Sequence, residues 1–516
     1  MKITTLLVTS VALTISGTCN AQLHGISFFS PRSQSTNAAR DISGIHPLRD
    51  LYDMHQKYGF FSITTTYTRS VRPDRIAEAL FSTNVLTLSG SQITNRPEQD
   101  FLADYFGLSP SFISSVQLVP RIQNALFIFD GYLGLDEWYP GLYAEIQIPA
   151  GWTDWKMELR EKVIQNGKET TFPANYMTTN ALAAPIERFE DALSGTVTFG
   201  HMQDPLKFGK VISCYSHSKN GLADVHGALG LNFLLRENGH VGLSLRAAAP
   251  TGSRPNGEFL FEPILGNGKH WELGIGFNGH VLVWEKDGEQ EMAFHAQANF
   301  MHLFGACQRR SFDLKTNGSF SRYMLAKEFK DGDYTGTLTP LINYTTLPCK
   351  VTVDFQADIA LMFCYTYNEF IFDLGYNGWI RSKEKICIKD CIPLRTLGLK
   401  GIQNVIIPAN QLSNATQSTA TIFGDEFSEQ NNVVDSNSPI FISTNDLDER
   451  SAASPRLVTH KLFTHFGYTW LEKNHTPFVG IGGEIEFEGI NPHNTAKPER
   501  NTLAQWGVWF KSGVTF

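Results

Sequence analysis

The sequence predicts an all-β fold, namely a closed antiparallel transmembrane β-barrel of about 14 strands, within a range of about 12–16. Many segments alternate apolar and polar residues with a period of two, which is typical of strands with one apolar face. Several of these segments run for ten or more residues, whereas globular strands have about 5–6 and tilted membrane-spanning strands need about 9–11. The chain also ends on such a strand, residues 505–516. If that strand pairs with the first one, the sheet closes into a barrel.

The first 21 residues predict a secretory signal peptide. Lys2 precedes an uncharged, mostly apolar stretch over residues 3–15, and residues 19–21 offer a small-residue cleavage site after Ala21. We therefore expect residues 1–21 to be removed on export. The alternative is a lipoprotein processed at Cys19, but the three residues before Cys19 fit the pattern of that processing poorly.

Composition limits the function classes. The formal net charge is −8 at pH 7, and an acidic exported protein is a poor candidate for nucleic-acid binding. Aromatic residues make up 12% of the chain, with 37 Phe, 16 Tyr and 9 Trp. Beyond the signal, no run of about 18 apolar residues offers a transmembrane helix. High aromatic content without such a run suits a membrane barrel, in which alternate residues of each strand face lipid. A secreted soluble β-protein is the alternative.

Residues 22–56 lack strand-like alternation. They contain short helix-compatible pieces that are interrupted by Gly44 and Pro47. We expect this segment to precede the barrel, either as a plug or as a periplasmic piece. The barrel itself is expected over residues 57–516.

Long hairpins dominate the rest of the chain. Residues 227–252 form one, with a turn at Asn238-Gly239, and residues 269–300 form another, with a turn at Asp287-Gly288. Further alternating strands are expected at residues 350–363, 370–380 and 478–489.

Two long segments interrupt the strands, at about residues 164–205 and 384–456. The second is polar and rich in Asn, Ser and Thr. Polar loops of this length suit the extracellular side of a barrel, whose periplasmic turns are short. Part of one loop could fold into the lumen, and the alternative is a mobile surface loop without a task.

The final strand places Phe516, Val514, Phe510 and Val508 on one face. This pattern resembles the C-terminal signature of Gram-negative outer-membrane β-barrel proteins, a terminal aromatic residue preceded by apolar residues at alternate positions. Ser512 departs from it, because it is small but not apolar. The resemblance implies location in the bacterial outer membrane, contacts with its lipid and lipopolysaccharide, and recognition by the barrel-assembly machinery.

The inward-facing charges are the candidate selectivity residues. Parity along the strands places the following residues in the lumen: Glu272, Asp354, Asp358, Asp373, Glu484, Glu486, Glu488, Arg246 and Lys511, together with His240, His280 and His295. The set leans acidic, and carboxylates around a wet pore favour cations. Glu484, Glu486 and Glu488 share one face of one strand. Each residue taken singly could instead pair across strands and only solvate the wall.

An enzymatic function has one candidate motif. Residues 216–221, "SHSKNG", superficially resemble the His-x-Ser-Asn-Gly motif of outer-membrane phospholipases. Here Ser218 directly follows His217, and adjacent strand residues point to opposite faces, so the histidine cannot readily activate the serine. An Asp/His constellation like that of omptin proteases would need inward pairs from separate strands, which the sequence does not single out. We expect no enzymatic activity.

A second resemblance concerns transport. Pro250-Thr251-Gly252 end one strand before a loop and a glycine-alternating strand, which is similar to barrels of the fatty-acid and aromatic-hydrocarbon transporter type. Those transporters carry an N-terminal hatch with an Asn-Pro-Ala motif, which residues 22–56 lack. The same three residues could simply end a strand and start a turn.

Six cysteines remain after signal removal, and their pairing is open among fifteen arrangements. Cys387 and Cys391 form the one close pair and could close a small disulfide loop or stay as thiols. No His or further Cys lies at ligand spacing beside them, so no metal site is expected. No cofactor is implied.

These features together predict an outer-membrane pore for passive diffusion of small polar solutes through an acidic-leaning lumen. The alternatives are an outer-membrane transporter for hydrophobic solutes, and a surface-exposed adhesin or structural barrel. An open lumen would favour the pore, whereas a lumen filled by residues 22–56 would favour a plugged transporter or a structural barrel. The sequence does not specify the oligomeric state.

Overall fold

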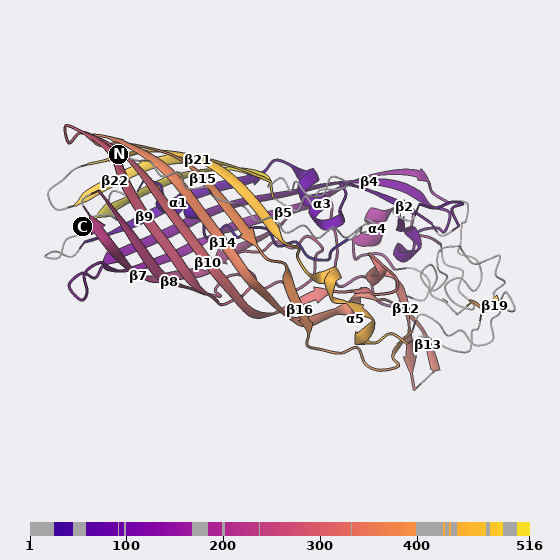
Figure 1. Ribbon diagram of the computed structural model, residues 1–516. Helices are drawn as coiled ribbons and strands as arrows, with labels where there is room; N and C mark the ends of the chain where they lie inside the picture. Colours follow the sequence, from indigo (N-terminus) through magenta and orange to yellow (C-terminus); the bar gives the residue numbers. More distant parts are fainter. Residues whose placement is uncertain are drawn as a thin grey trace, which may run out of the picture.

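The computed structural model describes residues 25–44, 58–90, 92–97, 100–167, 184–198, 202–236, 238–331, 333–398, 427–428, 433–434, 441–470, 475–488 and 503–516 (Figure 1). The predicted signal peptide, residues 1–21, lies outside these residues, as do parts of both segments predicted as long loops. In the described part of the chain, no helix is both long and apolar enough to span a membrane.

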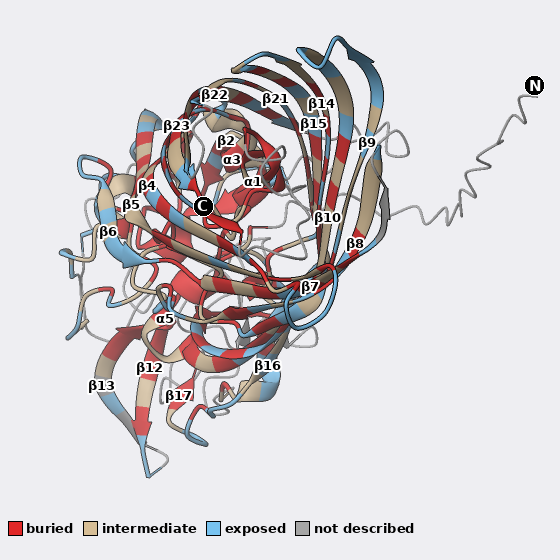
Figure 2. Ribbon diagram, turned by 90° about the vertical axis from the view of Figure 1, so that its left-hand side faces the viewer, coloured by how far each residue is buried: buried red, intermediate tan, exposed pale blue. Residues whose placement is uncertain are grey.

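Within the described residues, twelve antiparallel strands close into a barrel (Figures 1 and 2). In pairing order they are β4 (Ile113–Gly134), β1 (Gly59–Ser70), β23 (Gln505–Thr515), β22 (Thr476–Glu488), β21 (Leu457–Thr469), β15 (Phe370–Arg381), β14 (Thr346–Tyr367), β10 (Gln290–Ser311), β9 (Glu272–Lys286), β8 (Gly239–Ala249), β7 (Val225–Arg236) and β5 (Leu142–Gln165). β5 pairs back onto β4 and completes the ring.

The ring has fewer strands than the central estimate of about 14 from the sequence, although twelve lies within the predicted range. Four further strands join the same sheet without entering the ring. They are β2 (Val85–Ser89), β3 (Phe101–Leu102), β6 (His217–Leu222) and β16 (Glu384–Ile388). Alternation in the sequence marks a strand but does not reveal whether that strand is part of the closed ring.

The first and last strands of the barrel pair with each other, as predicted. β1 and β23 run antiparallel in continuous register from Phe60↔Thr515 to Ser70↔Gln505. At the end of this ladder, the backbone amides of Gly59 and Phe516 each donate to the other residue's carbonyl, at 2.9 and 3.0 Å. The sheet therefore has no open edge at the seam, which satisfies the backbone polar groups that lipid could not.

The ring strands alternate between exposed and buried residues, which appears as stripes in Figure 2. The exposed residues are largely apolar, and the buried face is polar on strands such as β1 and more apolar on β4 and β14. On β1, for example, Phe61 is 62% exposed, whereas Ser62 and Thr64 point inward and are buried. Large exposed apolar side chains occur on all twelve ring strands, so they form a continuous apolar outer surface. This arrangement is the inverse of a soluble sandwich and is that of a barrel embedded in lipid.

The two ends of the barrel differ. Short connections link β7 to β8, β9 to β10 and β14 to β15, and they lie at the end where β1 begins and β23 finishes. In the β9–β10 turn, Asp287 and Gly288 have φ angles of 56° and 68°, the left-handed values that a type I′ turn requires. The long connections all lie at the opposite end, which agrees with the predicted asymmetry.

A folded cap occupies the end with the long connections (Figure 1). β4, β5, β10 and β14 have 22 to 24 residues each and extend past the barrel into it. Its other elements are α3 (Pro73–Phe81), η1 (Ala103–Phe106), α4 (Phe189–Leu193), β11 (Asp313–Leu314), η2 (Ser321–Tyr323), β12 (Leu325–Lys330), β13 (Asp333–Pro340), α5 (Ile342–Thr345), β17 (Leu397–Gly398), η4 (Thr444–Asp446), β20 (Leu447–Asp448) and η5 (Glu449–Ala452). A separate pair, β18 (Phe427–Ser428) with β19 (Val433–Val434), completes the described strands.

The cap has its own hydrophobic core, which is centred on aromatic side chains. The ring of Phe320 lies 5.5 Å from that of Phe81, 4.7 Å from that of Phe101 and 5.9 Å from that of Phe106. All four residues are at least nine-tenths buried. The cap is therefore a packed unit built on the mouth of the barrel, and not a set of unsupported loops.

We expect Ile481→Lys to lower the free energy of unfolding by about 2–4 kcal/mol in lipid vesicles, because a charge on the lipid face is costly near the middle of a bilayer. Ile481 lies midway along β22 and is 61% exposed. The control, Leu394→Lys, is 82% exposed outside the ring and should change stability by less than about 0.5 kcal/mol. Urea titration followed by tryptophan fluorescence measures both, and equal effects would contradict a lipid-facing outer surface.

Candidate functional site

Residues 25–44 lie inside the molecule and are named here the lumen segment. The segment starts in the cap, where the amides of Ile26 and Ser27 donate to the carbonyls of Leu80 and Ser451 at 2.7 and 2.8 Å. It ends in the barrel with helix α1 (Ala38–Ile42), which packs against β10, β14 and β15 (Figure 1). The chain therefore runs from the cap down the lumen toward the end with the short turns, where β1 begins.

Two arginines anchor the outer part of the lumen segment. Arg381 donates to the side-chain and backbone oxygens of Ser30 at 2.8 and 2.7 Å. Arg310 lies over the ring of Phe28 and pairs with Glu384 at 3.3 Å. Burial opposes ionisation of Glu384, but the two guanidinium groups outweigh that effect and hold its pKa below the usual value. The anchor is therefore a charged network that remains ionised although it is buried.

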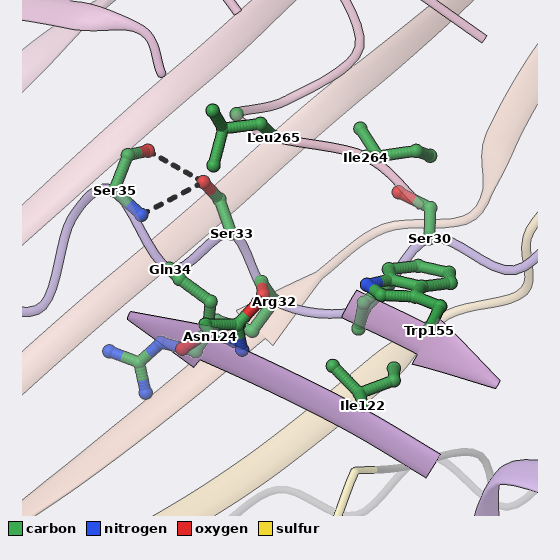
Figure 3. Close-up of a pocket in the computed structure, with 12 residues that line it drawn as sticks. Ser30, Arg32, Ser33, Gln34, Ser35, Ile122, Asn124, Trp155, Ile264 and Leu265 are labelled. Carbon is green, nitrogen blue, oxygen red and sulfur yellow. Dashed lines mark hydrogen bonds between the residues drawn. The ribbon is translucent and has the colours of Figure 1, made fainter. Parts of the chain in front are cut away.

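Residues 30–35 then pass against the wall near the mouth of the barrel (Figure 3). Ile122 and Trp155, from β4 and β5, line one side of a small pocket there, and Leu265 lines another. The hydroxyl of Ser33 accepts from the amide of Ser35 at 3.3 Å, which turns the chain locally. The segment is thus held by its own turn as well as by the wall.

The middle of the segment is held by Arg32 and Asp358. One guanidinium nitrogen of Arg32 lies 2.9 Å from both carboxylate oxygens of Asp358, and the other donates to Asn377 at 2.7 Å. The amide of Ala38, at the start of α1, also donates to Asp358 at 3.0 Å. The side chains of the ion pair are only 2% and 9% exposed. Removing one partner of such a buried ion pair strongly destabilises the folded protein, because the other charge remains buried without its partner.

Helix α1 is tied to the predicted acidic row on β22. The side-chain amide of Asn37, the N-cap of α1, donates to Glu484 at 2.7 Å. Lys461 on β21 donates to the other oxygen of Glu484 at 2.9 Å and lies 3.4 Å from Glu486. Arg40 lies 3.9 Å from Glu484. Glu484 is therefore compensated by a wall lysine and by the lumen segment, and Glu486 lies near the same lysine.

The segment ends at Gly44, next to Asp373 and His465. The amide of Gly44 donates to Asp373 at 2.9 Å, and the Nδ1 atom of His465 lies 3.0 Å from the same carboxylate. Gly44 has a φ of +74°, which glycine adopts without strain, and a Cβ there would collide with the His465 ring. Lys511 on β23 donates to the carbonyls of Arg40 and Ser43 at the C-terminal end of α1, where a cation is favourable.

The lumen thus contains most of the charged residues predicted for it. Asp358, Asp373, Glu484, Glu486 and Lys511 are buried there, four of them in contact with the lumen segment. Arg246 is also inside and pairs with Glu145 at 3.1 Å. Glu272 is buried at the start of β9 and accepts from Asn267. The backbone of Glu488 pairs with Thr459, and its side chain lies outside the described part of the structure.

The prediction that Asp354 faces the lumen is wrong, because its side chain does not line the lumen. It is 47% exposed and pairs with the exposed Lys385 at 2.5 Å. The reason is a β-bulge: Leu303 pairs with Val353 and Met301 with Gln356, so two residues of β14 oppose one of β10. Beyond a bulge, the other set of alternate residues faces the lumen. The apolar and polar alternation of the sequence does not reveal where a bulge lies.

Sequence reasoning missed the partners of these carboxylates. Arg32 and Asn37 come from a segment without periodicity, and nothing in the sequence indicates where their side chains point. Lys461 and His465 could have been found, because they alternate with the exposed Leu462 and Phe466 along β21.

The remaining candidate residues also have definite places. Phe516, Val514, Phe510 and Val508 all point outward and are 36% to 49% exposed, and Phe516 stacks on Phe61 at 5.6 Å. Cys387 and Cys391 are exposed and not joined to each other. His217 and Ser218 occupy adjacent positions on β6, outside the ring, opposite Trp155 and Asp154. No group of three or more His, Cys, Asp or Glu side chains among the described residues is placed to hold a metal ion.

The Pro250-Thr251-Gly252 motif directly follows β8 and begins the long connection to β9. The hydroxyl of Thr251 donates to the carbonyl of Ala223 and accepts from the amide of Val225. The amide of Gly252 donates to the buried Asp224 at 3.0 Å. The motif therefore fastens the loop after β8 to the start of β7, a structural role like that of the strand end and turn considered from the sequence.

Comparison with known proteins returns matches among solved structures alone: no family model and no curated protein matches the chain. An outer membrane channel from Pseudomonas putida F1 is 10% identical, covers 89% of this chain and 96% of its own, and has a TM-score of 0.35. A Pseudomonas aeruginosa FadL homologue is 6% identical over 96% and 98%, with a TM-score of 0.28. The P. putida toluene transporter TodX is 10% identical over 96% and 97%, with a TM-score of 0.26.

The predicted closed antiparallel barrel is confirmed by the strand pairing of the chain itself. All three TM-scores lie below 0.5. The function proposed below therefore rests on the lumen of this chain and not on its neighbours.

We expect Arg32→Gln to lower the free energy of unfolding by about 3–5 kcal/mol, because it leaves the Asp358 carboxylate buried without its cation. Adding Asp358→Asn to that variant should recover part of the loss, since no uncompensated charge then remains. The temperature at which the folded form is lost on unboiled SDS gels measures the effect. Additive losses in the double variant would contradict a direct pair, and Arg72→Gln, at an exposed ion pair, serves as the control.

Proposed function

We propose that the protein is a gated outer-membrane channel for small polar solutes, in which residues 25–44 act as a plug. The observation that carries the proposal is the polar lumen wall, whose charged side chains bond to the lumen segment inside a closed barrel. The hydrogen bonds between the segment and the wall can be exchanged for bonds to water and solute at modest free-energy cost, and the apolar part of the contact is small, a cluster in which α1 contributes Ala38, Ala39 and Ile42. The proposal adds a gate to the passive pore expected from the sequence.

Three features support a place in the outer membrane. The continuous apolar outer face suits lipid, the short turns and the long connections lie at opposite ends, and the terminal strand presents the outward row ending in Phe516. We infer that the barrel contacts outer-membrane lipid and lipopolysaccharide and that the barrel-assembly machinery recognises the terminal strand. The cap would then face the outside of the cell.

The composition of the wall favours polar solutes over hydrophobic ones. Inward positions of β1 carry Ser62, Thr64, Thr66 and Thr68, all buried. Asn124 and Thr153 continue this polar face on β4 and β5 and bond to each other at 2.7 Å. A route for hydrophobic solutes would need an apolar lining instead, because transfer out of water has to be offset along the way.

We expect the mature chain from Gln22, refolded and placed in a planar bilayer, to conduct only in brief openings, because the lumen segment fills the barrel. A variant that lacks residues 25–44 should conduct steadily, at least about tenfold above the time-averaged wild-type current, a change equivalent to about 1.4 kcal/mol. Both proteins must first pass a test of folding by gel shift and circular dichroism. Silence of the folded deletion variant would refute the channel and would favour a structural barrel.

The reversal potential of the deletion variant in a salt gradient should indicate preference for cations. Removal of the segment exposes Asp358, Asp373 and Glu484, and the inward acids of this region then outnumber Lys461 and Lys511. In that background, Glu484→Gln combined with Glu486→Gln should shift the reversal potential toward zero, whereas Asp354→Asn, outside the lumen, should leave it unchanged. Anion preference, or equal shifts in both variants, would contradict the assignment of selectivity to the wall.

A further inference from the structure

We propose that a pocket at the mouth of the barrel binds the hydroxymethyl group of a small neutral solute, such as the CH₂OH group of a hexose. The pocket lies between residues 30–35 of the lumen segment and residues 264–266 of the loop that connects β8 to β9 (Figure 3). The inference rests on the proposed function in taking the bound molecule to be a transported solute. Binding itself is a property of the folded chain and can be measured without any current.

The pocket lies at the outer end of the barrel, directly beside the segment that fills the lumen. Two of its wall residues, Ile122 on β4 and Trp155 on β5, pair with each other in register. The amide of Ile122 donates to the hydroxyl of Ser70, the last residue of β1, at 3.0 Å. Since β1 begins at the end with the short turns, this level is the mouth beneath the cap. The pocket is therefore placed where a solute that enters from the cap would meet the lumen segment.

One half of the pocket is apolar and held rigidly in place. Ile122 and Trp155 line it from the wall, and Leu265 lines it from the loop. The Nε1 atom of Trp155 donates to the hydroxyl of Thr153 at 2.9 Å, which fixes the ring. The amide of Leu265 donates to the hydroxyl of Ser253 at 2.8 Å, and its carbonyl accepts from the amide of Ser253 at 2.7 Å. This half offers a preformed apolar surface to the methylene carbon of a ligand.

The other half of the pocket is polar and comes from the lumen segment. Ser33 and Gln34 line it, and both residues are partly exposed. The backbone N–H groups of these two residues and the carbonyl of Ser33 make no hydrogen bond to any described residue. Peptide groups in such a confined place need a partner, which water or a ligand can supply. A hydroxyl group suits them, because it donates one hydrogen bond and accepts others.

The charge and the size of the pocket narrow the ligand further. Among the described residues that line it, Arg32 is the one charged side chain, and its terminal nitrogens are engaged by Asp358 and Asn377. An ionised ligand group would thus lose its hydration without gaining a counter-charge. The enclosed space holds about one or two water molecules. It therefore suits one carbon with its hydroxyl, while the rest of the solute stays in the water of the mouth.

The test is titration of the refolded full mature chain, from Gln22, with D-glucose, D-xylose and D-glucuronate, followed by saturation-transfer NMR of the sugars. These sugars share one ring and carry CH₂OH, hydrogen and carboxylate, respectively, at the same carbon. We expect glucose to bind at least about tenfold more tightly than xylose, because it adds a buried methylene and a hydrogen bond. Glucuronate should bind no more tightly than xylose. Equal affinities for glucose and xylose in a demonstrably folded chain, or tighter binding of glucuronate, would overturn the proposal.

Matched variants of the lumen segment place the site. Ser33→Leu fills the pocket and should abolish the preference for glucose over xylose, whereas Thr36→Leu adds the same side chain outside the pocket lining and should leave it unchanged. Should Ser33→Leu fail to fold, Ile264→Phe fills the pocket from the loop, with the same expected loss. A preference that survives in the folded filling variant would overturn the site. A silent deletion variant would refute the channel and leave the sugar preference of the full chain intact, so the two proposals fail separately.

Discussion

The structure depends on the closure of the sheet between its first and last strands. Every second residue of an edge strand leaves its backbone donor and acceptor unpaired, and in lipid no water is present to satisfy them. Pairing of β1 with β23 over eleven register positions removes that cost. Closure also creates an inside and an outside, so the same alternation that covers the outer face with Phe, Leu and Ile lines the inside with Thr, Asn and charged residues.

Charged side chains in the lumen are destabilising unless they are paired, because they are largely removed from water. Residues of the lumen segment pair with them. Arg32 meets Asp358, Asn37 meets Glu484, and the amide of Gly44 meets Asp373. The wall contributes Lys461 and Lys511 to the same network. The lumen segment therefore occupies space inside the barrel and pairs with the charges of the wall. In the proposed channel, moving the segment would expose the groups that govern the passage of solutes.

The cap restricts how the lumen segment can move. Its outer end is built into the cap through Phe29, which packs against Trp155 and Phe261, and through Ser30, which accepts from Arg381. The inner end is held by ion pairs and hydrogen bonds on the wall and by a small apolar cluster in which Ala38, Ala39 and Ile42 join side chains of the wall such as Met362 and Trp509. Rearrangement of the inner half, with the outer half as an anchor, costs less than withdrawal of the whole segment, because fewer apolar contacts are lost.

The sequence by itself determined that long alternating strands close into a barrel, which residues face outward along most of them, and that the ends are unequal, although not the number of strands in the ring. Period-two alternation, strand length and turn residues are local properties. The sequence also placed Asp358, Asp373 and Glu484 in the lumen by parity. Tertiary structure alone decided the rest. A bulge turned Asp354 outward, four strands joined the sheet outside the ring, and an aperiodic segment took its place between charges more than 300 residues away in sequence. Such contacts depend on where two distant segments meet in space, and no local pattern in either segment encodes that meeting.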